Sequence, residues 1–143
     1  MNKITFGKIL YTINNSKSLY SKKIEECSIS IGLTKPEADV LLFFGNNPRF
    51  TNACDAVEQR KFSKAYVSKA ISLLLKKELI TITSNEKDKR YQQIALTKSS
   101  KKYLTKLQKC QEEYISSLLN GISKEDFNIF LKVIEKIIEN YSN

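Results

Sequence analysis

The chain has 143 residues, of which 41% are hydrophobic, and it contains only four glycines and two prolines. This composition fits one folded domain with a buried core, and it excludes a disordered chain or a loop-rich disulfide scaffold. No apolar run approaches the roughly 18 residues that a membrane span needs, and the first residues lack the apolar core of a signal peptide. We therefore expect a cytoplasmic protein with no membrane association.

The positive charge is concentrated in one part of the chain. The formal net charge is +9, from 24 basic and 15 acidic residues. Residues 60–109 hold 14 basic and 3 acidic residues, whereas the remainder holds 10 basic and 12 acidic. Such asymmetry is typical of a phosphate-binding surface. A solvated lysine-rich surface is the simpler alternative, but the helix and hairpin patterns in the same stretch favour nucleic acid.

The residues that usually support catalysis or metal binding are scarce. There is no histidine, and Cys27, Cys54 and Cys110 are far apart and form no CxxC pair. This pattern does not predict a structural zinc site, a cofactor or an enzyme. We expect all three cysteines to be reduced thiols that act as small apolar residues, Cys54 in a buried packing role.

The sequence predicts four helices before a β-hairpin. An apolar pattern indicates a helix over 3–29, with a weak or bent middle at 14–16. A capping box from Thr34 to Glu37, with a proline in the first turn, begins the second helix. A short helix is predicted over 53–58, a turn over 60–62, and a longer helix over 63–77.

The helix over 63–77 has two different faces. Val67, Ala70, Ile71 and Leu74 recur at the spacing that buries one side of a helix. The opposite face carries small, polar and basic residues, and no acidic residue occurs between positions 60 and 77. A helix of this kind can enter the major groove of DNA.

A hairpin and two further helices follow. The alternation of apolar residues predicts strands over 79–84 and 91–97, joined by a long, mobile, cationic loop over 85–90. Helices are predicted over 98–119 and from the Ser123 cap to the end of the chain. The order indicates a mainly α fold with a small β-hairpin wing, a winged helix-turn-helix with helices added at both ends.

The last helix has an apolar stripe wider than a small winged-helix core needs. We expect terminal helices from two chains to interlock, although internal packing is the alternative. A two-fold dimer would place two recognition helices about 34 Å apart on a palindromic site. The predicted dimer-interface residues are Ile9, Ile13, Leu118, Phe127, Phe130, Leu131, Ile134, Ile137 and Ile138.

Several short motifs together resemble the MarR family of bacterial transcription regulators over essentially the whole chain. The best match begins with Phe62-Ser63-Lys64-Ala65-Tyr66-Val67-Ser68-Lys69-Ala70-Ile71 and continues through Leu74 to Lys77-Glu78-Leu79-Ile80. Asp88-Lys89-Arg90 is similar to the family's Asp-x-Arg wing signature, and Leu96-Thr97 to the pair that opens the following helix. Leu33-Thr34, Glu37 and Val40-Leu41 also fit.

The resemblance implies a role for individual residues. Arg90 would enter the minor groove, with Asp88 orienting it by a charged hydrogen bond. The full set of predicted DNA-binding residues is Thr51, Ser63, Lys64, Ala65, Tyr66, Ser68, Lys69, Lys87, Asp88, Lys89 and Arg90. Packing against the preceding helix is an equal alternative for Tyr66, and a pure capping role is the alternative for Ser63.

The resemblance also has departures and an open question. Glu78 and Ser100 stand where the family usually has glycine, so Glu78 is expected to alter the exit into the wing. Arg60 and Lys61 stand where an apolar and a small residue are common.

Members of the family often respond to small aromatic or phenolic ligands, and some to thiol oxidation. The sequence does not decide between these regulators, and Phe43, Phe44, Phe50 and Tyr20 fit either a ligand cavity or a core.

The predicted organisation is one MarR-like domain over 1–143. Residues 34–97 form its winged-helix DNA-binding region, and residues 1–30 and 98–143 its dimerisation helices. The predicted function is a homodimeric, sequence-specific transcription regulator, a repressor, whose partners are double-stranded DNA and a second copy. A small aromatic ligand is one candidate effector, and the sequence leaves its existence open. The rival hypotheses are a nonspecific architectural DNA-binding protein and a protein–protein adaptor that uses the winged helix.

Overall fold

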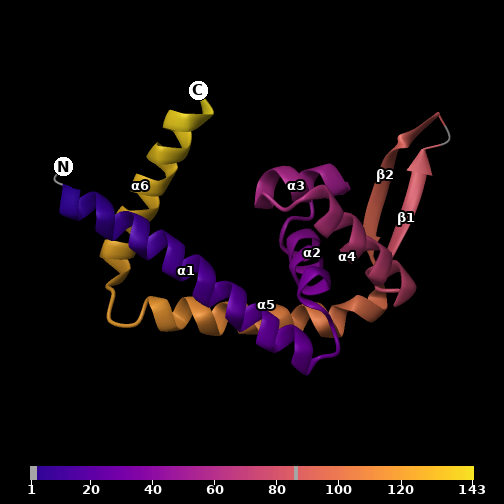
Figure 1. Ribbon diagram of the computed structural model, residues 1–143, viewed down its shortest axis with the longest axis horizontal. Coiled ribbons are helices and arrows are strands. Elements are labelled where there is room, and N and C mark those ends of the chain that lie inside the picture. Colours follow the sequence, from indigo (N-terminus) through magenta and orange to yellow (C-terminus); the bar gives the residue numbers. More distant parts are fainter. Residues whose placement is uncertain (1–2, 86) are drawn as a thin grey trace. The chain divides into compact units, whose positions relative to one another are not determined.

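The computed structural model describes residues 3–85 and 87–143, without the side chains of residues 4, 85 and 88–90. The described residues form six α-helices, one 3-10 turn and one hairpin (Figure 1). The elements are α1 (Lys3–Ser30), α2 (Lys35–Asn46), α3 (Ala53–Arg60), α4 (Lys64–Lys76), β1 (Ile80–Asn85), β2 (Asp88–Leu96), the turn (Lys98–Ser100), α5 (Lys101–Leu118) and α6 (Lys124–Ser142). The predicted mainly α winged-helix fold is confirmed.

The chain divides into two compact units, Met1–Glu112 and Glu113–Asn143. The first unit contains α1 to α4, the hairpin and most of α5, and the second contains the end of α5 and α6. α1 runs without a break through positions 14–16, where the sequence suggests a weak middle. No helix among the described residues has the length and apolar content needed to cross a membrane.

Side-chain caps fix where the helices of the first unit begin. Thr34 and Glu37 form the predicted capping box of α2, with Pro36 in the first turn. Asn52 and Asp55 form a second capping box at α3. Both boxes satisfy backbone N–H groups that a helix start leaves unpaired. α3 continues to Arg60, two residues beyond the predicted helix, and ends at Lys61 in the left-handed conformation (φ 55°).

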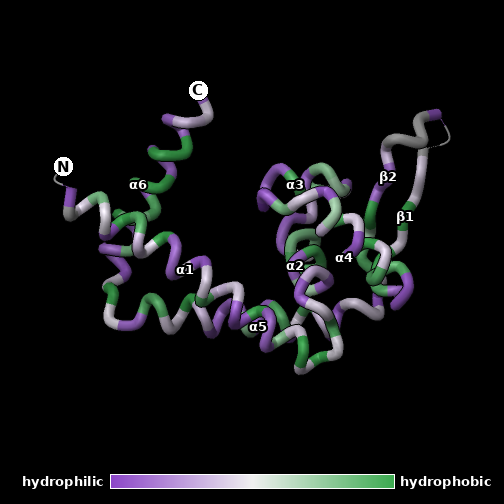
Figure 2. Tube along the Cα trace, in the orientation of Figure 1, coloured by the Kyte–Doolittle hydropathy of each residue, from purple (hydrophilic) through white to green (hydrophobic). Residues whose placement is uncertain are grey.

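The core of the first unit lies around α2. Every residue from Ala38 to Phe44 is buried, and α2 packs on α1, α3 and α4. Apolar stretches of these helices are visible in Figure 2. Phe43 stacks on Phe50 with ring centroids 5.6 Å apart. These aromatic residues therefore form core rather than the lining of a cavity. Gly45 lets α5 approach closely, because a Cβ there would overlap the side chain of Leu104.

α4 ends in a turn that normally uses glycine. Glu78 has φ 57°, its N–H donates to the Leu75 carbonyl at 3.0 Å, and the Leu79 N–H donates to the Leu74 carbonyl at 2.9 Å. This pair of hydrogen bonds is the Schellman motif. The expected change in the exit from α4 is therefore wrong: Glu78 takes the left-handed conformation itself, with some strain, and buried Leu74 and Leu79 accompany the turn.

The hairpin is longer than the sequence suggests. β1 and β2 are antiparallel, with Ile80 opposite Leu96 and Ile82 opposite Ile94 as the alternation predicts. Pairing continues to Asn85 opposite Asp88, after an irregularity between Ser84 and Asn85. The predicted loop over 85–90 is therefore too long, because a bulge allows the strands to continue pairing past an irregular register. Glu86 lies outside the described residues.

The expectation for the cysteines is wrong in two respects. Cys27 at the end of α1 and Cys110 on α5 form a disulfide, with Cα atoms 6.7 Å apart and a separation of 83 positions in sequence. The spacing in sequence did not predict this pairing, because the two cysteines come close only when the fold brings the two helices together. Tyr20 and Gln111, joined by a hydrogen bond, link the same two helices. Cys54 is free and exposed, not buried.

The predicted dimer residues remain largely uncovered in the single chain. In the second unit, α6 contains no buried residue, although an apolar face runs along it (Figure 2). Leu118, Phe130, Leu131, Ile137 and Ile138 are exposed, as are Ile9 and Ile13 of α1, and Phe127 and Ile134 are half-buried. Their role in a dimer remains a prediction.

Candidate nucleic-acid interface

α4 presents two chemically different faces. Val67, Ala70 and Leu74 are at most 1% exposed, and α4 packs against α2. Lys64, Ala65, Ser68, Lys69 and Ser72 are exposed on the outer side. Ser63 precedes them as the N-cap, and its Oγ accepts a hydrogen bond from the Tyr66 N–H at 3.1 Å. The outer face combines small side chains, which allow close approach, with flexible cations that can reach phosphates.

Two predicted contact residues are held by other parts of the fold. The Tyr66 hydroxyl donates to Asp39 Oδ2 at 2.6 Å, and its ring lies 5.1 Å from that of Phe62. Thr51 precedes α3, where its carbonyl accepts a hydrogen bond from the Ile94 N–H of β2 at 2.6 Å. Tyr66 thus packs on the preceding segment, and Thr51 ties that segment to the hairpin. A DNA contact by either residue remains a prediction.

The wing carries the other predicted contacts. Lys87 is exposed at the turn of the hairpin, and the backbone of Asp88, Lys89 and Arg90 forms the start of β2. The side chains of these last three residues lie outside the described part of the structure. Their predicted contacts with the DNA, and the pairing of Asp88 with Arg90, therefore remain predictions.

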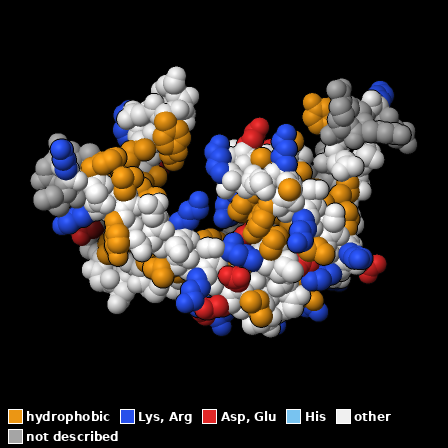
Figure 3. Space-filling view, in the orientation of Figure 1, with side chains coloured by type: hydrophobic (Ala, Val, Ile, Leu, Met, Phe, Trp, Pro, Cys, Tyr) orange, Lys and Arg blue, Asp and Glu red, His pale blue; other side chains and the backbone are white. Residues whose placement is uncertain are grey.

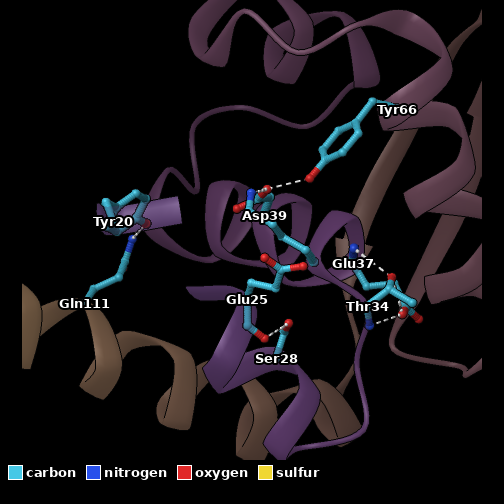
Figure 4. A network of polar contacts seen from close by, with 9 residues as sticks. Tyr20, Glu25, Ser28, Thr34, Glu37, Asp39, Tyr66 and Gln111 are labelled. Carbon is cyan, nitrogen blue, oxygen red and sulfur yellow. Dashed lines mark hydrogen bonds and ion pairs between the residues drawn. The ribbon is translucent and has the colours of Figure 1, made fainter. Parts of the chain in front are cut away.

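Two buried carboxylates of α2 have partners on α4 or at its C-cap, and Figure 4 shows the contact of Asp39 with Tyr66. Asp39 is 2% exposed and accepts hydrogen bonds from both Tyr66 and Lys35, each at 2.6 Å. Burial, together with the hydrogen bond to the Asp39 carboxylate, raises the pKa of the Tyr66 hydroxyl above its usual value. Sequence reasoning missed this site. The sequence contains one indication of this site, because the acidic Asp39 stands between Ala38 and Val40 inside an apolar run.

The second buried carboxylate is Glu37, which is fully buried. Its Oε2 accepts hydrogen bonds from the N–H and the hydroxyl of Thr34, both at 2.7 Å. Lys77 Nζ lies 2.8 Å from Oε1, an ion pair whose angle does not give a directed hydrogen bond. Burial alone would raise the pKa of Glu37, but Lys77 and Thr34 outweigh it and lower the pKa below 4.5. The capping role was predicted, but the pairing with Lys77 was not.

Because these carboxylates are buried, they add no negative side chain to the outer surface. Lysine and arginine side chains are distributed over the surface of the first unit in Figure 3. A groove of about 730 Å³ also lies beside α4, between α3 and the hairpin. Its apolar lining includes Val57, Ile71, Leu75 and Ile82, and the free Cys54 lies at its edge.

The outer face of α4 is exposed and has no acidic residue, and a two-stranded wing follows the helix. Together these elements define a winged helix-turn-helix with a candidate nucleic-acid interface. The model of the MarR family matches residues 31–90, which include α2 to α4 and most of the hairpin. No curated protein matches the sequence.

Solved structures extend the likeness beyond the matched residues. A MarR-family regulator from Silicibacter pomeroyi is 16% identical with a TM-score of 0.82, over 94% of this chain and 90% of that one. A putative MarR-family regulator from Listeria monocytogenes, solved with a 26mer DNA, is 19% identical with a TM-score of 0.81, over 92% and 87%. A Staphylococcus aureus MarR in complex with salicylate and kanamycin is 16% identical with a TM-score of 0.76, over 97% and 93%. The chain therefore has the sequence pattern of the MarR family over residues 31–90 and the winged-helix fold of MarR-family structures over most of its length.

Proposed function

We propose that this protein is a cytoplasmic, sequence-specific DNA-binding transcription regulator that represses its target promoters. The observation that carries the proposal is the outer face of α4, which exposes Lys64, Ala65, Ser68 and Lys69 with no acidic neighbour between positions 60 and 77. Inserted in the major groove, the small side chains meet base edges and the lysines meet phosphates. Repression follows when the bound protein blocks access to a promoter. No enzymatic activity is proposed.

The proposed binding unit is a homodimer on a palindromic operator. The support is the apolar face of α6, whose side chains are exposed in the single chain. Isolated exposed apolar residues are common on protein surfaces, but a continuous helical stripe is typical of an interaction surface. Two-fold symmetry would repeat the recognition helix about one DNA turn away. Ile9 and Ile13 of α1 are proposed to contribute to the same interface.

The wing is proposed to bind beside the recognition helix. The position of residues 88–90 at the start of β2 supports this role, as does the resemblance of Asp88-Lys89-Arg90 to the wing signature of the MarR family. Arg90 would enter the minor groove while Lys87 and Lys89 contact the backbone. Arg90→Ala should then weaken binding about tenfold and lower the salt slope by about one phosphate contact.

A small aromatic molecule is the proposed effector. The salicylate complex of the Staphylococcus aureus protein supports this ligand class. We place the ligand in the groove between α3, α4 and the hairpin, because an occupant there contacts Ile71 and Leu75 of the recognition helix. Salicylate should then release the protein from DNA in a concentration-dependent way. Leu75→Lys should remove that response by making the apolar wall of the groove charged.

Fluorescence anisotropy tests the proposed function directly. The protein is titrated onto the duplex from upstream of its own gene and onto a scrambled duplex, each at several salt concentrations. Tight binding to the first duplex alone, falling linearly in log salt, is the expected result. Equal binding to both would favour an architectural protein. No binding at low salt, also to duplexes selected from a random pool, would favour the protein–protein adaptor.

A further inference from the structure

The two buried carboxylates of α2 both have partners on the recognition segment. Asp39 holds Tyr66 in the first turn of α4, and Glu37 holds Lys77 at the C-cap of α4. We propose that Asp39 and Glu37 are positioning residues: they fix the rotation and axial position of α4, and thereby set the sequence specificity of DNA binding without touching DNA. This inference rests on the proposed function.

The two attachments lie far apart on one side of the helix. Tyr66 and Lys77 are eleven residues apart, which corresponds to about 16 Å along a helix axis. Eleven residues also turn a helix by about 20° beyond three full turns, so both side chains leave from the side that faces α2. A helix attached at both ends in this way cannot rotate or slide without breaking one of the two contacts.

The apolar packing between α2 and α4 cannot fix that position equally well. The contacts of Val67, Ala70 and Leu74 are close, but apolar attraction has no direction. A shift by one residue moves a helix by about 1.5 Å and turns its faces by about 100°. The charge-assisted hydrogen bond of Tyr66 to Asp39, at 2.6 Å, depends on both distance and angle, and the ion pair of Lys77 with Glu37, at 2.8 Å, depends on distance. They therefore select one arrangement among those that bury a similar apolar area.

A change in this position affects the two kinds of DNA contact differently. The short side chains of Ala65, Ser68 and Ser72 reach base edges only from one orientation. Lys64 and Lys69 have long flexible side chains that still find phosphates after a small rotation. Loss of the buried contacts should therefore lower affinity for the preferred sequence and leave nonspecific affinity nearly unchanged.

The test uses a duplex that the wild-type protein selects from a randomised pool, with a scrambled duplex beside it. Tyr66→Phe removes the hydroxyl but keeps the ring on Phe62, and Asp39→Asn removes the charge of the acceptor. Each variant should lower the ratio of specific to nonspecific affinity about tenfold. The double variant should lose no more than either single variant, because both substitutions break the same contact. The salt slope on the scrambled duplex should not change.

The other attachment has its own pair of variants. Glu37→Gln keeps a residue that suits the capping box but removes the charge that pairs with Lys77, and Lys77→Met removes the partner. These variants should also lower the ratio and should also be non-additive. Lys35→Met is the matched control, because it removes a partner of Asp39 that lies on α2 and leaves the contact with α4. The control should keep the ratio within about twofold of the wild-type value.

Several outcomes would overturn the inference. They are an unchanged ratio in Tyr66→Phe, an equal loss on both duplexes, or additive effects of Asp39→Asn and Tyr66→Phe. A loss in Tyr66→Phe that Asp39→Asn does not reproduce would show that the hydroxyl contacts DNA directly. If circular dichroism shows that Asp39→Asn is unfolded, the inference is tested by Tyr66→Phe together with Glu37→Gln and Lys77→Met. If the wild-type protein selects no sequence, the proposed function itself fails, whatever the variants do.

Discussion

α4 and α6 are both amphipathic helices, but they leave opposite faces uncovered. The apolar face of α4 is buried against α2, and its polar, basic face is exposed. α6 has no buried residue, and its apolar side chains are exposed along its length. A helix whose apolar face is already covered is suited to a polar partner. A helix whose apolar face is uncovered needs an apolar partner.

We infer that the difference between the two helices separates the two proposed functions of the chain, DNA binding and assembly. α4 offers small and cationic side chains, which suit the base edges and phosphates of DNA. α6 offers a stripe that includes Phe130, Ile137 and Ile138, which suits the same stripe of a second copy. Changes to one helix should therefore affect DNA contacts, and changes to the other should affect assembly. The predictions below test that separation.

The largest expected effect concerns the stability of the first unit. Replacing Cys27 and Cys110 with serine should lower the free energy of unfolding by about 4 kcal/mol, because the disulfide closes a loop of 83 residues. Urea denaturation with and without reductant measures the effect, and Cys54→Ser is the control. The dimer dissociation constant should change little, since neither cysteine is among the proposed interface residues. A similar loss in the control would contradict this assignment.

A charge on the apolar face of α6 should disrupt assembly. Ile134→Lys buries an unpaired charge in the proposed interface and should raise the dimer dissociation constant about 100-fold, or about 3 kcal/mol. Sedimentation equilibrium measures the constant. Asn128→Lys adds the same charge at an exposed position away from the stripe and should have little effect. Equal effects in the two variants would show that the stripe is not the interface.

Acid should weaken the attachment between α2 and α4 through Glu37. Its pKa is lowered in the folded protein, so its contribution is present above pH 4.5 and is lost as pH falls through the folded pKa. Glu37→Gln should cost about 1 kcal/mol at pH 7, since Lys77 is 41% exposed and water screens the pair. Unfolding measured from pH 7 to pH 3 should show a smaller loss in the variant than in the wild-type protein.

The smallest effect concerns the turn that follows α4. Glu78→Gly should stabilise the protein by roughly 0.5 kcal/mol, because relief of the left-handed strain is partly offset by the flexibility of glycine when unfolded. Thermal unfolding measures the change. Glu78→Ala keeps a Cβ at the same φ and should bring no such gain. A gain in both variants would indicate that charge, not backbone strain, is responsible.

Local sequence patterns predicted most of the helices and the hairpin register. The capping box at Thr34, the spacing of Val67, Ala70 and Leu74, and the alternation through Ile80 and Ile82 depend on near neighbours, so they can be read from the chain. The outer face of α4 was predicted for the same reason, and the structure places those residues at the surface.

Contacts between distant segments could not be predicted in this way. The pairing of Cys27 with Cys110 and of Asp39 with Tyr66 depends on which helices the fold brings together. The left-handed backbone of Glu78 could not be predicted for a different reason. The surrounding Schellman hydrogen bonds impose that strained conformation, which is not the preference of a glutamate. The start of β2 at Asp88 could not be predicted either, because it depends on an irregular strand register that no residue type indicates.

The most direct measurement of the central claim is the salt dependence of DNA binding for paired lysine variants of the two helices. Lys64→Ala with Lys69→Ala should lower the slope of log affinity against log salt by about 2, because two phosphate contacts are lost from α4. Lys132→Ala with Lys136→Ala removes the same charge from α6 and should leave the slope unchanged. Equal slopes in both pairs, or a loss confined to the α6 pair, would contradict the assignment of α4 as the DNA-binding helix.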